Sequence, residues 1–397
     1  MDDPAQTARR VAAIAPFHVM EVQTAARALE AAGIDVVHME IGEPDFATPE
    51  PVCMAAKVAL DHASIHYTSA LGLPELRQAI AEHYRSHYAV AVDAGQVIVT
   101  AGSSAALLLV LALVVDRDDE ILMADPNYPC NRHLVRTLEG VPVSVACDAH
   151  SRYQLTAAQV ERQWTARTRG VLVASPSNPT GTTIASDELS RIAATVAQRR
   201  GHLIVDEIYL GLTYGERPRS VLALTQDAFV ISGFSKYFSM TGWRLGWIVA
   251  PRQHVRDLEK LAQNLYISPP TLSQRAALAC FGDATMAIVE SRRKAFAARR
   301  DFLVRALRDL GFGIAQAPDG GFFIYADCSR WSHDGEAFCR DMLASAHVAI
   351  TPGIDFGQHA ANRHVRFAYT TGMHRLHTGV ERLAAWLPTL PRVAARE

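Results

Sequence analysis

Lysine is scarce in this chain of 397 residues. Only four of its 39 basic residues are lysines, and arginine supplies the other 35. Lys57, Lys260 and Lys294 lie in stretches of helical periodicity, where long charged side chains usually face solvent. Lys236 differs, because it lies among small residues in the stretch SGFSKYFSMTGWRLGW. Its setting requires a chemical explanation rather than one based on solubility.

Other features are absent, and each absence excludes a class of protein. The six cysteines are scattered, without a Cys-x-x-Cys pair, which argues against a zinc site and a disulfide framework. A net charge of −2 provides no strong field for nucleic acid or an anionic membrane. The longest apolar run, residues 105–115, is far shorter than the ~20 residues that cross a bilayer. The N-terminal stretch carries acids where a signal peptide is basic. We therefore expect a cytoplasmic protein that binds no membrane, nucleic acid or metal.

Several well-known motifs are missing as well. The turn at residues 102–104 lacks the Gly-Lys-Ser/Thr ending of a Walker loop, and no Gly-x-Gly-x-x-Gly follows a strand. Gly233 stands three residues before Lys236, which removes the Ser-x-x-Lys of serine hydrolases. No Gly-x-Ser-x-Gly occurs either. Nucleotide binding and serine-based hydrolysis are therefore not indicated.

What the chain does contain is an alternation of helical segments with short β-branched strands. Strands are expected at QVIVT, EILMA, GVLVAS, HLIVDE and AFVISG. This order predicts an α/β fold with a mostly parallel mixed sheet covered by helices on both faces. Near residue 285 the pattern changes to one long arginine-rich helix and then a smaller α+β segment. We predict a large domain over 45–285 and a smaller α+β domain built from both chain ends, 1–44 and 286–397.

Polar residues are expected at the carboxyl ends of these strands, where parallel sheets bind ligands. The turn at residues 102–104 can cradle a phosphate, although Ser is also an ordinary helix N-cap. Asp206 ends a strand, which is also a common place for a solvated acid. Arg366 stands inside an apolar strand, where a buried guanidinium needs an anion. Together with Lys236 and Arg244, these are the groups that pyridoxal phosphate (PLP) requires.

Nine stretches carry a specific resemblance to a known family. They are, in order, GEPDF, HYTSALGLPELR, DPNYP, SPSNPTG, DEIY, SKYFSMTGWRLGW, DGGFF, TPGIDFG and HVRFAYTT. Over most of its length the chain resembles the class I and II aminotransferases, which are fold-type-I PLP enzymes similar to aspartate aminotransferase. The resemblance implies PLP as cofactor. It also implies an enzyme that moves an amino group from an α-amino acid to a 2-oxo acid by a ping-pong mechanism.

The resemblance implies roles for residues around the cofactor ring. Lys236 would form the internal aldimine and, once released, move a proton between the substrate Cα and the cofactor. A free lysine with a pKa of about 10.4 is a poor base at neutral pH, so burial and nearby cations must lower that pKa. Asp206 would keep the pyridine nitrogen protonated. Tyr209 and Asn178 would hydrogen-bond the ring oxygen, and Tyr128 would stack on the ring.

The resemblance also implies how the phosphate and the substrate are held. The phosphate would be bound by Arg244, Ser235, Gly102, Ser103 and Ser104. Tyr67 would reach it from the partner subunit of a homodimer with shared active sites. Arg366 would grip the substrate α-carboxylate through two parallel hydrogen bonds, with Asn178 and Gly42 beside it.

The chain departs from the family pattern at the phosphate and at the substrate side chain. Relatives commonly have Ser at the position of Gly233, so one phosphate hydroxyl is lost or comes from Ser232. Aspartate-specific relatives bind the distal carboxylate of the substrate with an arginine in the stretch matching residues 264–271, or with a lysine at the position of Ser104. Neither cation occurs here. We therefore predict neutral or apolar amino donors, with apolar residues near the mouth of the site: Phe17, Val19, Ile41, Tyr266 and Ile267.

Two alternatives to an aminotransferase stay open at this point. A PLP lyase of the same fold, of the β-lyase or aminocyclopropane-carboxylate-forming type, would share every cofactor residue. A PLP-binding regulator is the second alternative. Regulators of that kind carry an N-terminal DNA-binding domain, whereas the residues before GEPDF are expected to form a helix and a strand of the small domain.

Overall fold

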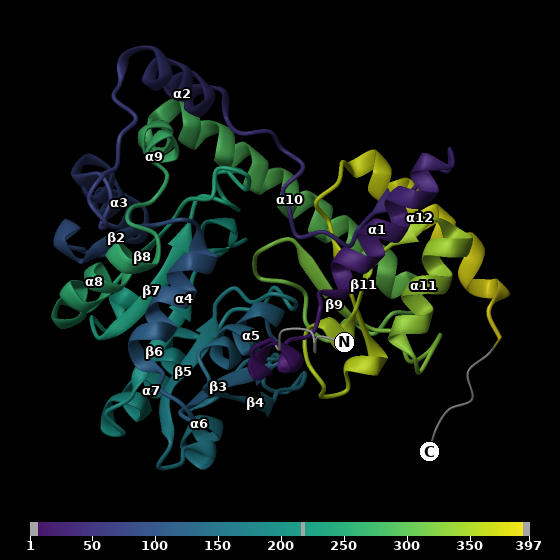
Figure 1. Cartoon of the computed structure of the whole chain (residues 1–397). Helices are drawn as coiled ribbons and strands as arrows, with labels where there is room; N and C mark the ends of the chain where they lie inside the picture. The colour runs from purple at the N-terminus through teal and green to yellow at the C-terminus, as the bar shows by residue number, and fades with distance from the viewer. Residues whose placement is uncertain (1–6, 216–218, 392–397) are drawn as a thin grey trace, which may run out of the picture.

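The structure is a computed structural model that describes residues 7–215 and 219–391. Figure 1 shows a larger body around a twisted sheet and a smaller body in which α1 lies beside α11 and α12. The helices of the larger body are α2 (Glu50–His62), α3 (Pro74–Tyr88), α4 (Ser103–Val114), α5 (Pro129–Thr137), α6 (Ala157–Gln163), α7 (Ser186–Gln198), α8 (Val255–Leu265) and α9 (Thr271–Ala277). Its strands are β2 (Val97–Thr100), β3 (Glu120–Asp125), β4 (Val141–Ala146), β5 (Thr168–Ala174), β6 (His202–Asp206), β7 (Ala228–Gly233) and β8 (Gly246–Val249).

In the described residues these seven strands form one sheet in the order β2-β8-β7-β6-β5-β3-β4. The neighbours from β7 to β4 run parallel, and β8 pairs antiparallel with both β2 and β7. Leu203 and Val205 of β6 pack into one core cluster with α3 and α7, whereas Ile204 packs into another with α4 and α8. Helices therefore cover both faces, and the predicted mostly parallel mixed sheet is confirmed.

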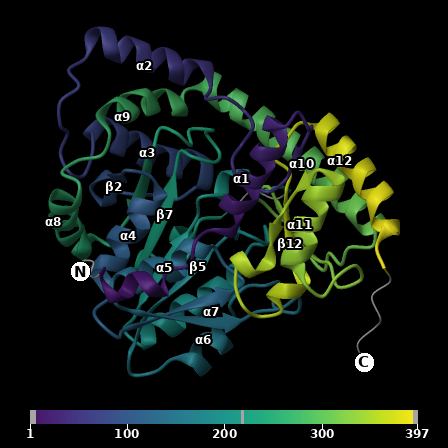
Figure 2. The same cartoon turned by 45° about the vertical axis from the view of Figure 1, so that its right-hand side comes forward.

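The smaller body joins the two ends of the chain. Its helices are α1 (His18–Ala31), α10 (Asp283–Asp309), α11 (Gly335–Ala346) and α12 (Met373–Trp386), and its strands are β1 (Val37–His38), β9 (Phe323–Asp327), β10 (Val348–Ala349), β11 (Thr351–Pro352) and β12 (His364–Ala368). β1 pairs parallel with β10, and β12 lies between β11 and β9 in an antiparallel sheet. Figure 2 shows α1 in the same body as α11 and α12 from a second direction, and Ala26 of α1 packs in one core cluster with Leu343 of α11. The strand expected before GEPDF is only two residues long, although Met39 beyond its end still bonds to Ala349 and Ala368.

The long helix α10 connects the two bodies (Figure 1). The boundary that we proposed at residues 285 and 286 falls in its first turn, so the domain ranges stay a proposal. The guanidinium of Arg299, in the middle of α10, donates to both carboxylate oxygens of Asp45 at 2.7 and 2.9 Å. It also lies 4.9 Å from the ring centroid of Phe46. These contacts fix the segment that carries Gly42 and Glu43 past the site.

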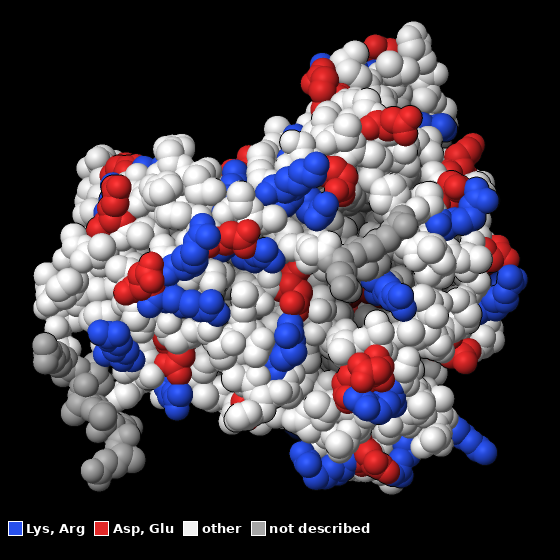
Figure 3. Space-filling model, turned by 180° about the vertical axis from the view of Figure 1, so that it is seen from behind, with Lys and Arg blue, Asp and Glu red and all other residues white. Residues whose placement is uncertain are grey.

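The surface is unremarkable in charge and composition. Lys57, Lys260 and Lys294 are exposed on α2, α8 and α10, as expected for solvated lysines. Figure 3 shows basic and acidic side chains interspersed over the face that it presents. Within residues 7–215 and 219–391, no helix is long and apolar enough to cross a membrane.

Candidate active site

A cavity of about 410 Å³ lies where the two bodies meet. The sequence-predicted residues that line it are Gly42, Ser103, Ser104, Tyr128, Asn178, Asp206, Tyr209, Ser235, Lys236, Arg244 and Arg366. Asp206 is the last residue of β6, and Lys236 follows β7 by three positions. Asn178 follows β5 by four positions. These side chains meet because the carboxyl ends of neighbouring parallel strands share one edge of the sheet.

Lys236 points across the cavity from the larger body. Its Nζ donates to the carbonyl oxygen of Gly42 at 2.7 Å. Burial lowers the pKa of Lys236 to about 8; Glu43 opposes this shift, while Arg244 and Arg366 add to it. The direction and the causes are those expected from the sequence. At pH 7 a pKa near 8 leaves about a tenth of the amine neutral, which is enough for a base or a nucleophile.

Asp206 is a buried carboxylate beside Lys236. Its Oδ1 accepts a hydrogen bond from the Ile208 amide at 3.0 Å, which leaves Oδ2 for a partner in the cavity. Burial raises the pKa of Asp206 to about 6, and the Ile208 amide and Lys236 act against that shift. A cation in the cavity would stabilise the ionised form. A protonated pyridine nitrogen is such a cation.

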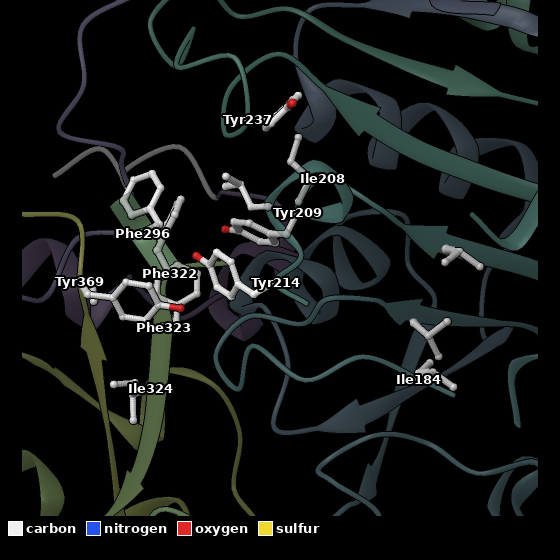
Figure 4. Close-up of a cluster of buried hydrophobic side chains, with 14 of the residues drawn as sticks. Ile184, Ile208, Tyr209, Tyr214, Tyr237, Phe296, Phe322, Phe323, Ile324 and Tyr369 are labelled. Atoms are coloured by element: carbon white, nitrogen blue, oxygen red, sulfur yellow. The ribbon is translucent and has the colours of Figure 1, made fainter. Parts of the chain in front are cut away.

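Tyr209 and Asn178 form a further wall. Tyr209 packs edge-on against Phe322 and Phe323, with ring centroids 5.4 and 5.7 Å apart. Figure 4 shows these three residues in one cluster of buried side chains. Asn178 Oδ1 accepts a hydrogen bond from Arg366 Nη1 at 2.9 Å. Because its oxygen is engaged, the Asn178 amide offers N–H donors on its other side. A phenolic oxygen in the cavity fits between these donors and the Tyr209 hydroxyl.

The N-terminus of α4 and Arg244 form an anion cradle. Gly102 has φ +89°, and a Cβ there would lie 2.7 Å from Arg244 Nη2. Only glycine allows both this backbone conformation and the close approach of the guanidinium. The free N–H groups of the first turn of α4 and the helix dipole add to the charge of Arg244. The cradle suits a phosphate.

The structure gives a local reason for a glycine at position 233. A Cβ at Gly233 would lie 2.6 Å from Ser103 Oγ, so the Ser103 side chain occupies the space that a residue at 233 would need. Ser103 Oγ donates to the carbonyl oxygen of Ser232 at 3.0 Å. Ser232 does not line the cavity, so the hydroxyl beside this position is that of Ser103.

Arg366 is buried on β12, with 4% of its surface exposed. Its guanidinium carbon lies 4.3 and 4.7 Å from the ring centroids of Phe323 and Phe356. Nη1 donates to Asn178, and Nη2 donates to Thr351 Oγ1 at 3.2 Å. Nε has no hydrogen-bond partner among the described residues. Burial lowers the pKa of Arg366 to about 10, which leaves it cationic. A carboxylate in the cavity would pair with this cation.

The remaining wall is mostly apolar. Of the residues expected near the mouth, Phe17, Val19 and Ile41 line the cavity, whereas Tyr266 and Ile267 do not. Tyr67 also lies outside the cavity, and 79% of its surface is exposed. Its reach into a partner's site stays a prediction.

Sequence reasoning missed several residues of the cavity wall. Glu43 lies in GEPDF, Phe323 in DGGFF, and Asp355 and Phe356 in TPGIDFG, so the motifs pointed to them without giving them a role. Met20 carried no signal, because nothing marks the first turn of a surface helix as a cavity wall. Glu43 also accepts a hydrogen bond from the Thr241 hydroxyl.

Comparisons with known proteins agree with this chemistry. The family model for aminotransferase class I and II matches residues 34–383. A valine–pyruvate aminotransferase from Mycobacterium tuberculosis is 38% identical over 380 residues, which cover 95% of this chain and 98% of the relative. An aspartate/prephenate aminotransferase from Thermus thermophilus is 34% identical over 379 residues, with 95% and 97% covered.

Solved structures lead to the same family. The crystal structure of an aminotransferase from M. tuberculosis matches with a TM-score of 0.93 at 38% identity, covering 97% of this chain and 99% of that one. Aspartate aminotransferase from T. thermophilus with maleate has a TM-score of 0.90 at 33% identity, with 96% and 99% covered. An amine, a strand-end carboxylate and an anion cradle in one cavity fit PLP, and matches of this extent show that the chain belongs to the PLP-dependent class I and II aminotransferases.

Proposed function

We propose that this enzyme takes its amino group from a neutral or apolar α-amino acid and passes it to a 2-oxo acid. One observation carries the choice of substrate. Among the described residues, the charged side chains that line the cavity are Glu43, Asp206, Lys236, Arg244, Asp355 and Arg366. The three cations are needed for the cofactor aldehyde, its phosphate and the substrate α-carboxylate. No cation is left for a distal carboxylate, and an unpaired carboxylate in a closed site would lose several kcal/mol of hydration.

Each residue has a defined task in this proposal. When bound, PLP supplies an electron sink that stabilises negative charge at the substrate Cα. Asp206 would hold the proton on the ring nitrogen, and Arg244 would hold the phosphate with the first turn of α4. Arg366 orients the substrate through its α-carboxylate. Lys236 takes the proton from Cα and returns one, which a pKa near 8 allows in both directions.

The named relatives differ in substrate. The mycobacterial relative is named for valine and pyruvate, which carry one carboxylate each. The Thermus relative is named for aspartate and prephenate, which carry two. The cavity of this chain favours the first kind, because Phe17, Val19 and Ile41 offer apolar surface without a distal cation.

The test is a comparison of donors. Single amino acids are mixed with the PLP-loaded enzyme while the cofactor absorption spectrum and the 2-oxo acid product are followed. The specificity constant kcat/KM is then measured for alanine, leucine, phenylalanine, methionine and aspartate with one common acceptor. We expect the best neutral donor to exceed aspartate at least about tenfold, which needs only about 1.4 kcal/mol of differential binding. Aspartate as the best donor would reject the proposed substrate class.

We further propose a homodimer that uses the apolar surface near α2 and α9. The Thr271 hydroxyl donates to the carbonyl oxygen of His66 at 2.7 Å, which holds the segment after α2 against α9. The exposed large apolar residues of this region are Met54, Val58, Leu60, Ile65, Tyr67, Leu265 and Ile267. Exposed apolar residues gathered in one region are typical of an interface. Light scattering after size exclusion should give a dimer, and Leu60→Glu should shift it toward monomer. A monomeric wild-type enzyme would contradict the proposal.

The cytoplasmic location expected from the sequence is part of the same proposal. All six cysteines are free, as is usual in a reducing compartment. Fractionation of cells that produce the enzyme tests this location directly.

A further inference from the structure

Asp355 lines the cavity and is 2% exposed. It ends a short 3₁₀ turn, Gly353–Asp355, just after β11. Its carbonyl oxygen accepts a hydrogen bond from Arg132 Nη2 at 2.7 Å. Arg132 belongs to α5, so the turn is held against the larger body at the border of the cavity.

The Asp355 side chain is bonded to a segment more than three hundred residues away. The helix α1 begins at His18, and its N-cap residue Phe17 provides no side-chain acceptor. Asp355 Oδ1 accepts from the His18 amide at 3.1 Å, and Oδ2 accepts from the Val19 amide at 3.4 Å. The carboxylate therefore caps α1 and meets the positive end of its dipole. This cap keeps Phe17, Val19 and Met20 in place as a wall of the cavity.

The charge of Asp355 lies close to the site expected for the substrate carboxylate. Phe356, the next residue, has its ring 4.7 Å from the guanidinium carbon of Arg366. Burial raises the pKa of Asp355, while the two α1 amides, His18 and Arg366 lower it. A carboxylate that accepts two backbone N–H bonds is stabilised in its ionised form. Asp355 and Arg366 line the same cavity, so a fixed negative charge borders the space that would receive the substrate.

We propose that Asp355 is a specificity-determining residue, whose carboxylate on the first turn of α1 repels a second carboxylate in the substrate. The same hydrogen bonds position the apolar side chains of Phe17, Val19 and Met20. These side chains accept a neutral side chain of the substrate instead. Asp355 would thus serve selection in two ways, by like-charge repulsion and by placing an apolar wall. This inference rests on the proposed function.

The experiment separates charge from shape. Asp355→Asn removes the charge but keeps an oxygen that can accept from the His18 amide, and Asp355→Ser is a second neutral variant with a capping oxygen. Asp341→Asn is the matched control, because Asp341 is exposed on α11 and does not line the cavity. For each enzyme kcat/KM is measured for glutamate and for leucine with pyruvate as acceptor. Calorimetry gives the Kd of glutarate and of butyrate for the PLP-loaded enzymes.

We expect both Asp355 variants to raise the glutamate-to-leucine ratio of kcat/KM at least about fivefold. They should also lower the Kd of glutarate relative to that of butyrate by a similar factor. The Asp341→Asn enzyme should match the wild type in both ratios. The Ser variant decides the question if the Asn variant does not fold.

The two possible failures are distinguishable. A wild-type enzyme that prefers glutamate to leucine contradicts the proposed function itself. A wild-type enzyme that prefers leucine, with both ratios unchanged in the Asp355 variants, overturns only the role of Asp355. An increase that Arg132→Gln abolishes in the Asp355→Asn background would also overturn it, because Arg132, no longer attracted by the Asp355 charge, would then be binding the second carboxylate.

Discussion

The two walls of the active-site cavity are built in different ways. On the cofactor side, Asp206, Lys236 and Ser103 each stand within three residues of the end of a strand in one buried sheet. On the substrate side, the first turn of α1 and Asp355 come from opposite ends of the chain, and the His18 and Val19 amides donate hydrogen bonds to the Asp355 carboxylate. The first wall depends on one sheet, and the second on contacts between distant segments.

This difference predicts different consequences of mutation. Residues of the cofactor wall are held by continuous strand pairing, so an isosteric change there should remove chemistry and leave the fold intact. Residues of the substrate wall are positioned by individual bonds between segments, so changes there should alter which substrate is preferred. The predictions below test that division, from the largest expected effect to the smallest.

Lys236→Ala should lose at least about 100-fold in the rate of proton transfer at the substrate Cα, the usual scale for removing a positioned base. The measurement is exchange of the Cα hydrogen for deuterium, followed by NMR. The Lys57→Ala enzyme is the control, because Lys57 is exposed on α2.

Borohydride reduction of the PLP-loaded enzyme and peptide mapping should also place the cofactor label on Lys236. Label on Lys57, Lys260 or Lys294 instead would contradict the assignment.

Asp206→Asn should lower kcat by at least about tenfold while the enzyme still binds PLP and unfolds near the wild-type temperature. The amide has nearly the same shape, but it cannot stabilise a proton on the ring nitrogen by charge. Steady-state kinetics and calorimetry give both quantities. An Asp206→Asn enzyme with a near-normal kcat would reject the role of this carboxylate.

Arg366→Lys should lower kcat/KM for every amino donor about tenfold or more, because an ammonium cannot replace a planar guanidinium that holds a carboxylate by two bonds. The absorption spectrum of bound PLP should stay as in the wild type, since Arg366 is expected to bind the substrate and not the cofactor. Arg363→Lys, a change in a half-exposed ion pair with Asp327, is the matched control. Equal losses in both variants would point to a structural effect instead.

The smallest effect concerns pH. Below its pKa Lys236 is protonated, and only the neutral amine can bond to the cofactor aldehyde, so uptake of PLP by the cofactor-free enzyme should accelerate with pH and level off above about pH 8. Glu43 raises the pKa of Lys236, so Glu43→Gln should move that midpoint to lower pH. Stopped-flow absorbance measures the rate. A midpoint near 10, as for a solvated lysine, would contradict the buried setting.

Much of the fold could be predicted because its signals are local. The strand HLIVDE alternates between two buried faces within five residues, and the helix at 335–346 begins and ends as expected. The cofactor wall followed from the same rule, since residues at the carboxyl ends of parallel strands must meet. The family motifs then gave roles to residues such as Tyr209 and Arg244, which periodicity alone does not mark.

The sequence by itself therefore determined the sheet and the cofactor, and it singled out Lys236 as the lysine expected to serve that cofactor. Only the tertiary structure decided which other residues line the cavity. In the sequence Asp355 is simply an acid in a turn, and only the structure shows that the first turn of α1 bonds to it. In the sequence Gly233 lacks the hydroxyl that relatives have, and only the structure shows that the Ser103 side chain occupies the space beside it. The physical reason is the distance along the sequence over which each interaction acts. Strand and turn preferences act over a few residues, whereas a helix cap or a close contact between distant segments exists only after the chain has packed.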